Sequence, residues 1–277
     1  MTDDRIPVSR EGERPIGVFD SGVGGLTVVK ELFGQLPGEN IIYFGDTARV
    51  PYGIKSDRTV VKFSLQNSRF LAQFKIKLLI VACNTASAVG LDILRKEFPF
   101  PVLGVIEPGA RAALRLAKNK RIGVIGTEAT VSSRAYVKLI EGINPSARIF
   151  SQACSLFVPL VEEGWLEGEI TAAVVRKYLS SLKKKSIDSL ILGCTHYPLL
   201  KPLLQKEMEG IVLIDSAREV VAEAKKVLGD RGMLGAGNRT PYRRYYVSDM
   251  PARFVRVGKM FLGEDITPVE QVEIEKY

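Results

Sequence analysis

The 277-residue sequence predicts an α/β fold of two similar lobes, with mainly parallel sheets flanked by helices. Apolar segments of strand length alternate along the whole chain with segments of helical spacing, which is typical of this class. Two of the apolar segments, Leu78–Ala82 (LLIVA) and Ser189–Gly193 (SLILG), are continuous, as in parallel strands that are buried on both faces. Each is followed by a cysteine, by polar residues and by the start of a helix. The same pattern therefore occurs twice, once in each expected lobe.

The strands are expected where short apolar runs end at glycine, proline or polar residues. In chain order they are Pro15–Asp20, Asn40–Phe44, a run ending at Val81, Pro101–Val105, Lys120–Ile125, Ala147–Ser151, Leu190–Leu192, Ile211–Ile214 and Tyr245–Val247.

The helices are expected where apolar residues recur at intervals of three and four, as between Ile170 and Lys183. Pro198 is expected to open a helix, because proline suits a first helical turn. The other expected helices are Leu26–Phe33, Arg58–Phe74, Thr85–Glu97, Glu107–Ala117, a helix after Thr130 that runs to Ile140, Leu156–Glu163, Arg218–Leu228 and Pro251–Phe261.

The domain organisation follows from the two copies of the cysteine pattern. Residues 14–106 together with 215–277 are expected to form lobe one, and residues 107–214 lobe two, with the active site in the cleft between them. Residues 1–13 are polar and mixed in charge, which predicts a flexible N-terminal extension rather than a signal peptide. No run approaches the roughly 18 apolar residues of a membrane span. We therefore expect a soluble, cytoplasmic protein with no membrane partner.

Composition disfavours several other classes of protein. The net charge of +8 could suggest nucleic acid, but the basic clusters Lys183–Lys185 and Arg239–Arg244 lack the interleaved aromatic residues of known binding patterns. A basic surface that attracts anionic substrates is the preferred interpretation, and no nucleic-acid partner is expected. Three separated cysteines and one histidine neither indicate a disulfide framework nor supply the usual zinc ligands, so no metal is expected.

The thiols of Cys83 and Cys194 are the main chemical signal. Both follow a strand and precede a helix, and a helix N-terminus favours the thiolate form. Cys154 lacks this context and is interpreted as structural. Two thiols on facing lobes suit inversion at a carbon next to a carboxylate, because one can remove the α-proton while the other returns a proton. His196 near Cys194 and Asp20 near Cys83 are the expected partners.

The glycine loop Ser21–Gly25 permits two interpretations. Together with Thr27 and Asp46 it resembles a weak dinucleotide-binding fingerprint, although the third glycine of that motif is absent. As a helix start with free N–H groups, the same loop suits a carboxylate. Further neutral donors are expected at strand ends, namely Asn84, Thr85, Thr127, Thr130 and Thr195. Each of these threonines could also simply cap a helix.

Five motifs, in order, resemble the cofactor-independent glutamate racemases of bacteria, a branch of the aspartate/glutamate racemase superfamily. The resemblance covers Pro15 to Leu228, and its motifs are FDSGVGGLTV, GDTARVPYG, ACNTASA, GVIGTEAT and GCTHYPLL. It implies a two-lobe α/β fold, glutamate as substrate, no cofactor, a homodimer and a role in making D-glutamate for peptidoglycan. It does not predict activation by a cell-wall precursor, because the extension that senses one in some members is short here.

The resemblance also implies roles for individual residues. Cys83 and Cys194 match the two acid/base residues, and Asp20 and His196 match residues that assist them. A catalytic glutamate is expected in the LVEEGW segment, with Glu163 preferred to the adjacent Glu162. The residues expected to bind substrate are Asp20, Ser21, Tyr52, Gly53, Asn84, Thr85, Thr127, Thr130, Thr195 and His196.

Three alternatives remain open from the sequence. A racemase of the same superfamily acting on aspartate is the nearest, since the depth of the side-chain pocket is not evident from the residues. A nucleotide-binding dehydrogenase depends on the imperfect glycine loop alone. A non-catalytic protein that binds nucleic acid depends on net charge alone.

Overall fold

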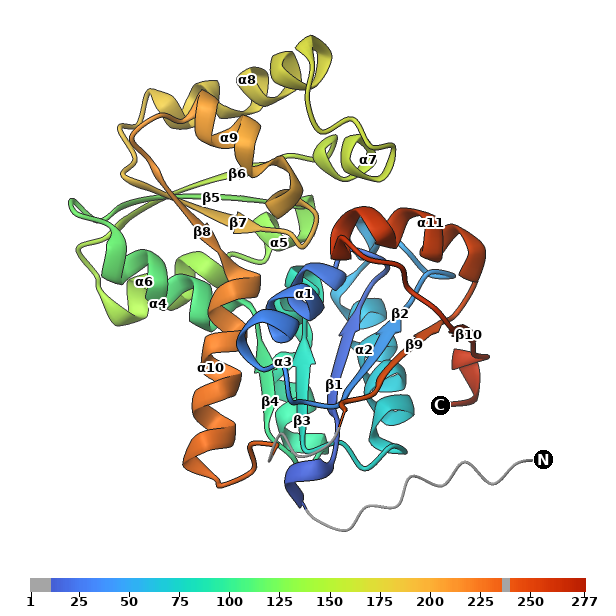
Figure 1. The fold of residues 1–277 in the computed structure, drawn as a ribbon. Helices are drawn as coiled ribbons and strands as arrows, with labels where there is room; N and C mark the ends of the chain where they lie inside the picture. The colour runs from blue at the N-terminus through green and yellow to red at the C-terminus, as the bar shows by residue number, and fades with distance from the viewer. Residues whose placement is uncertain (1–10, 236–239) are drawn as a thin grey trace.

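The computed structural model describes residues 11–235 and 240–277, which form two parallel sheets with helices on their faces (Figure 1). The first sheet has six strands in the order β10-β9-β2-β1-β3-β4, and the second has four in the order β6-β5-β7-β8. Every pairing in both sheets is parallel. The α/β fold class predicted from the sequence is confirmed.

The strands of the first sheet come from both ends of the chain. They are β1 (Ile16–Asp20), β2 (Ile41–Gly45), β3 (Leu78–Val81), β4 (Val102–Gly104), β9 (Arg243–Val247) and β10 (Val269–Gln271). The strands of the second sheet lie between them in sequence. They are β5 (Arg121–Gly126), β6 (Arg148–Ala153), β7 (Ser189–Gly193) and β8 (Val212–Asp215).

The helices and the short 3-10 turns connect the strands. The helices are α1 (Leu26–Gln35), α2 (Asp57–Ala72), α3 (Asn84–Glu97), α4 (Ile106–Leu116), α5 (Glu128–Ser132), α6 (Ala135–Ile143), α7 (Phe157–Glu162), α8 (Glu169–Lys183), α9 (Lys201–Glu207), α10 (Ser216–Asp230) and α11 (Pro251–Leu262). The 3-10 turns are η1 (Glu11–Glu13), η2 (Tyr52–Ile54), η3 (Tyr197–Leu200) and η4 (Ile274–Lys276).

Three details differ from the sequence-based expectation. The single helix expected to reach Ile140 is two helices, α5 and α6, because Arg134 between them adopts a left-handed conformation with φ 56°. The helix expected at Pro198 begins as the turn η3 and continues as α9. Strand β10 was not expected.

The chain passes between the two sheets twice, through α4 and through α10. Helix α10 leaves β8 of the second sheet, packs against α4, and then runs alongside the first sheet, where it packs against α1 (Figure 1). One buried apolar cluster extends across both sheets and includes Val18 and Val28 of the first lobe and Leu192 and Tyr197 of the second. Because the lobes share this core, residues from both can be held in fixed positions at their interface.

A buried lysine of lobe one holds the start of the described chain and the segment that follows α10. Lys77 pairs with the buried carboxylate of Glu39, and its Nζ also donates to the carbonyls of Gly12 at 2.6 Å and Met233 at 2.8 Å. Of the expected flexible extension, residues 1–10 lie outside the described residues. In the described part of the chain, no helix is long and apolar enough to cross a membrane.

Candidate active site

Cys83 and Cys194 occupy equivalent positions in the two lobes. Cys83 is the N-cap residue of α3, directly beyond the carboxyl end of β3, and its carbonyl accepts a hydrogen bond from the N–H of Ser87 at 2.9 Å. Cys194 directly follows β7, and its carbonyl accepts from the N–H of Tyr197 at 3.1 Å. Only 6% of Cys83 and 7% of Cys194 is exposed. Both thiols are therefore presented at strand ends but shielded from solvent.

Burial and, after it, the nearby carboxylate of Asp20 raise the pKa of Cys83 to about 12. The N–H of Ala86 and the hydroxyl of Ser21 oppose this rise by stabilising the thiolate, while Cys194 of the other lobe adds to it. Cys83 is thus a protonated thiol at neutral pH. The two cysteines, far apart in sequence, are therefore close enough across the lobe interface for the charge of one to affect the pKa of the other.

Cys194 is paired with the single histidine of the chain. Its Sγ lies 3.9 Å from Nδ1 of His196, and Nε2 of the same ring lies 3.1 Å from Oε1 of Glu162. Burial alone would lower the pKa of His196, but the hydrogen bonds to Cys194 and Glu162 outweigh it and raise the pKa to about 10. The ring therefore carries a positive charge at neutral pH and lies next to the Cys194 sulfur.

The acidic partner of His196 is Glu162 and not Glu163, which corrects the placement preferred from the sequence. Glu162 is the last residue of α7 and is half-buried, whereas Glu163 is exposed. Helical spacing contained the signal that separates them. Glu162 follows the half-buried Val158 by four residues and so shares its face, while Glu163 follows the exposed Pro159.

Asp20 ends β1 and is completely buried beside the second lobe. Its carboxylate accepts hydrogen bonds from the N–H of Gly22 at 3.1 Å and from the hydroxyl of Thr195 at 3.5 Å. Burial raises the pKa of Asp20, and the positive charge of His196 opposes that rise. The expected partner of Cys83 thus also contacts the segment that carries Cys194.

The glycine loop lies against the His196 segment. A Cβ on Gly24 would lie 2.5 Å from Nδ1 of His196, and a Cβ on Gly25 would lie 2.5 Å from Cβ of Asp20. Thr27, which occupies the position of the missing third glycine, donates through its hydroxyl to the carbonyl of Thr195 at 3.2 Å. The glycines therefore allow the two lobes to approach closely, and protein atoms occupy the space next to the loop.

Three of the predicted threonines form one cluster across the lobes. The hydroxyl of Thr85 lies 3.1 Å from that of Thr127 and 3.3 Å from that of Thr130, and these two are 3.0 Å apart. Thr127 also caps α5 by accepting the N–H of Thr130 at 3.3 Å. A Cβ on Gly53 would lie 2.8 Å from Cβ of Thr127, so this loop of lobe one also touches lobe two.

Asn84 is held by a tyrosine that sequence reasoning missed. The hydroxyl of Tyr136 donates to Oδ1 of Asn84 at 2.8 Å and lies 3.0 Å from Oγ of Ser216. Burial raises the pKa of this tyrosine above its usual range. Tyr136 lies in α6 of the second lobe, within a segment whose apolar residues predicted only a core-facing helix.

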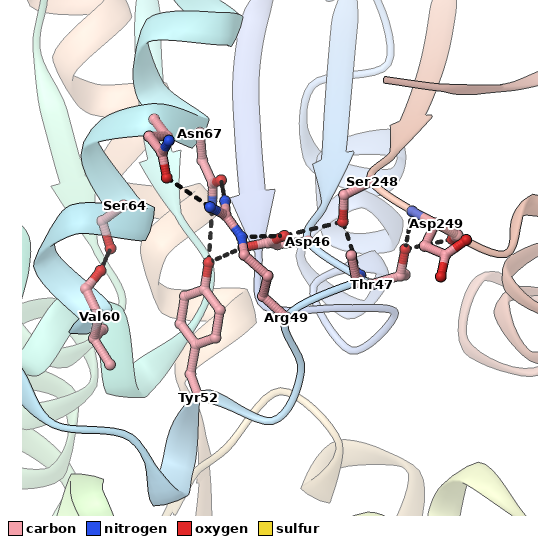
Figure 2. Close-up of polar contacts among 11 residues, drawn as sticks. Asp46, Thr47, Arg49, Tyr52, Val60, Ser64, Asn67, Ser248 and Asp249 are labelled. Carbon is pink, nitrogen blue, oxygen red and sulfur yellow. Dashed lines mark hydrogen bonds and ion pairs between the residues drawn. The ribbon is translucent and has the colours of Figure 1, made fainter. Parts of the chain in front are cut away.

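The hydroxyl of Tyr52 is engaged within lobe one. It hydrogen bonds to the carboxylate of Asp46 and accepts from Nδ2 of Asn67 at 3.0 Å (Figure 2). Asp46 is completely buried, pairs with Arg49 at 2.8 Å and accepts from the hydroxyl of Ser248 at 2.9 Å. This network fixes the loop that precedes Gly53, so Tyr52 shapes the site by anchoring the loop backbone. The Asp46 carboxylate, considered above as part of a dinucleotide-binding fingerprint, makes its hydrogen bonds within this network.

Ten of the predicted residues fall into two groups, while Tyr52, Asn84 and Glu163 lie outside them. Asp20, Ser21, Cys83, Cys194, Thr195 and His196 form one linked group, while Gly53, Thr85, Thr127 and Thr130 form a second. Within residues 11–235 and 240–277, no three His, Cys, Asp or Glu side chains are grouped so that they could hold a metal ion. The site is a buried, polar assembly with a thiol from each lobe.

Comparisons with known proteins agree with this geometry. The family model for Asp/Glu/Hydantoin racemase matches residues 16–224. A glutamate racemase of Geobacter metallireducens is 50% identical over 263 residues, which cover 95% of this chain and 97% of that protein.

Solved structures give the same result. A glutamate racemase of Francisella tularensis, solved in complex with D-glutamate, is 42% identical with a TM-score of 0.91, covering 96% of this chain and all of that one. An aspartate racemase homologue of Pyrococcus horikoshii is 17% identical with a TM-score of 0.59. The match covers 78% of this chain and 99% of the homologue, and it shows a shared fold alone. The chain therefore belongs to the Asp/Glu/Hydantoin racemase family and, within it, to the glutamate racemases.

Proposed function

We propose that this chain interconverts L- and D-glutamate by passing protons between Cα and two thiols, Cys83 and Cys194. The observation that carries the proposal is that each lobe presents one buried thiol at a strand end with its own acid/base partner, Asp20 for Cys83 and His196 for Cys194. The identity to glutamate racemases supports the choice of substrate.

The surroundings of the thiols favour one starting state. In the proposed scheme Cys194, whose Sγ lies 3.9 Å from Nδ1 of His196, acts first as the base, and Cys83, with its pKa near 12, is the thiol that donates. The thiolate takes the α-proton from one face of the substrate, and the thiol gives its own proton to the opposite face of the carbanion. The product has the opposite hand, and the thiol and thiolate have exchanged places. A substrate of that hand then runs the sequence in reverse.

Negative charge that develops on the substrate carboxylate during proton removal needs fixed donors. The N–H groups at the start of α3 and the hydroxyls of Ser21, Thr85 and Thr195 supply them from both lobes, together with the amide of Asn84. All of these are groups of the chain itself. The scheme therefore uses no metal and no organic cofactor.

The test of substrate and reaction is circular dichroism of purified protein with L-glutamate and, separately, with D-glutamate, in buffer without added metal or cofactor. The signal should decay to zero from both sides. Decay with aspartate and a constant signal with glutamate would replace glutamate as the substrate. A constant signal with both amino acids would contradict racemisation.

We further propose that the product D-glutamate is supplied to peptidoglycan synthesis in the cytoplasm. The resemblance to bacterial glutamate racemases supports this role. Expression of the chain should restore growth of a bacterial strain that requires added D-glutamate, whereas a Cys83→Ser variant should not. Failure of the active wild-type chain to restore growth would contradict this role.

A homodimer is proposed as the working assembly. The resemblance supports it, and large apolar side chains near α7 and α8 are exposed, namely Leu156, Trp165 and Ile170. Light scattering should give twice the 30.5 kDa mass of the chain. A mass equal to one chain, in protein that is active, would contradict the dimer.

A further inference from the structure

Helix α11 reaches the candidate site, although the sequence of the C-terminal segment carried no motif. The helix packs against α1 of lobe one and lies next to the lobe interface (Figure 1). Its Phe261 ring contacts the His196 ring edge-on, with centroids 5.2 Å apart and an interplanar angle of 85°. On the same helix, the guanidinium of Arg253 lies 3.1 Å from Oε2 of Glu162.

A continuous series of contacts therefore connects α11 to the thiol of Cys194. Oε2 of Glu162 accepts a hydrogen bond from the guanidinium of Arg253 at 3.1 Å, and Oε1 lies 3.1 Å from Nε2 of His196. The other ring nitrogen of His196 faces Cys194. A carboxylate with both oxygens engaged cannot rotate without losing a charge-assisted hydrogen bond. Arg253 belongs to lobe one and the other three residues belong to lobe two.

We propose that Arg253 is a positioning residue, which holds the Glu162 carboxylate in the orientation that receives Nε2 of His196. The inference deepens the proposed function and rests on it, because the ring so oriented faces a reacting thiol. The contact crosses between the lobes, so it forms only when they are closed. Arg253 thereby couples closure of the lobes to the orientation of the acid/base partner of Cys194.

The side chain of Arg253 is 46% exposed and that of Glu162 is 20% exposed. Ion pairs at such sites contribute little to folding. Replacing Arg253 should therefore leave the protein folded and reveal its effect on the position of Glu162. The charged and titratable groups that face His196 are Cys194 on its own segment, Asp20 on β1 and Glu162 on α7, with Arg253 of α11 beyond Glu162.

The direction in which the pKa of His196 changes when Arg253 is replaced separates positioning from a simple charge effect. If Arg253 acted only as a nearby positive charge, its removal would raise the pKa of His196. If it holds Glu162 in place, its removal weakens the hydrogen bond to His196 and lowers that pKa. Because His196 is the only histidine in the chain, NMR of protein with labelled histidine follows this one ring without overlap.

The experiment compares Arg253→Met with Arg256→Met, a matched change at an exposed arginine of the same helix. Arg253→Met should lower the pKa of His196 toward the value in Glu162→Gln, and should reduce kcat/KM roughly two- to fivefold, as expected for an exposed ion pair. Arg253→Lys should recover most of both losses. Arg256→Met should change neither. A raised or unchanged pKa in Arg253→Met would overturn the proposal.

A double variant tests whether Arg253 acts through Glu162. In the Glu162→Gln background, Arg253→Met should cause no further loss of kcat/KM, whereas a full additional loss would overturn the proposal. Glu163→Gln, the adjacent change, should leave the pKa of His196 unaltered. The NMR titration needs no turnover, so wild-type protein inactive on glutamate would overturn the proposed function while the titration still decides the role of Arg253.

Discussion

The surroundings of the two thiols differ although both are buried. Cys83 lies beside the carboxylate of Asp20, which together with burial holds its pKa near 12 and keeps the proton on sulfur. Cys194 lies beside the imidazolium of His196. In the proposed scheme one proton is shared by the pair, as a reaction that removes and returns a proton requires. Once Cys83 loses its proton, its high pKa makes it a strong base for the reverse direction.

Cys83→Ser and Cys194→Ser should each reduce racemisation by at least about a hundredfold in both directions, because positioned acid/base groups contribute that much or more. Cys154→Ser is the matched control. Its thiol is buried and points toward the carbonyl of Gln152 at 3.7 Å, and it has no hydrogen bond to His196 or Asp20 among those of the described residues. Circular dichroism with each enantiomer measures the effect. Near-normal rates in either active-site variant would contradict the two-thiol scheme.

At the scale of elements, the glycine loop before α1 determines how closely the lobes approach. Gly24 has no room for a methyl group, because Cβ would lie 2.5 Å from Nδ1 of His196 and also against Oγ1 of Thr195. Such contacts are shorter than packed atoms allow, so the side chains of Thr195 and His196 or the segment that carries them must shift. The glycine is needed here for close approach between segments.

Gly24→Ala should lower kcat/KM about ten- to a hundredfold, because displacements near 1 Å can cost that much. The matched control is Gly34→Ala in the exposed part of α1, where a Cβ meets nothing within 4 Å. That change should leave activity intact and raise the free energy of unfolding by about 0.5–1 kcal/mol, measured by urea denaturation. Equal activity of the two variants would contradict the close-approach role of Gly24.

The elements that could be predicted from sequence are those with strong local patterns. The buried strands β3 and β7 have continuous apolar runs, and the cysteines that follow them lie at helix or turn starts as expected. Strand β10 was missed because its three residues, VEQ, are partly exposed and pair only with β9 at the sheet edge. The break between α5 and α6 depends on the left-handed Arg134, a residue type with no preference for that conformation.

Within the site, the residues that follow strand ends were predictable because parallel sheets place ligand-binding groups there. Tyr136 and Arg253 were not, since both lie on helices whose local sequence shows only a packing face. Their contacts with Asn84 and Glu162 form only when the two lobes come together. Pairings of this kind depend on the tertiary arrangement rather than on local sequence.

At the scale of the whole molecule, the lobes are closed around the site. Polar contacts cross the interface at Thr27 and Thr195, at Thr85 and Thr127, and at Asn84 and Tyr136. Both thiols are less than a tenth exposed. On the proposed function, we therefore expect glutamate to enter when the lobes separate, and the interface contacts to close the site again before proton transfer.

Alkylation by iodoacetamide should report this opening. Cys83 and Cys194 should react far more slowly than free glutathione, and bound glutamate should slow them further, about a hundredfold when its concentration is ~100 times Kd. Peptide mapping by mass spectrometry identifies the alkylated cysteine, and leucine at the same concentration serves as the control ligand. Alkylation as fast as that of glutathione, or unaffected by glutamate, would contradict a closed ground state.

The most direct test of the central claim is the fate of the α-hydrogen when L-glutamate is racemised in D₂O. With two thiols, the α-proton leaves from one face and a solvent-derived deuteron arrives from the other. Early in the reaction the D-glutamate formed should be fully deuterated at Cα, while the remaining L-glutamate keeps its hydrogen, as measured by chiral separation and mass spectrometry. The same asymmetry should appear from D-glutamate. Product that retains the original hydrogen, or remaining substrate that gains deuterium as fast as product does, would contradict the two-thiol account.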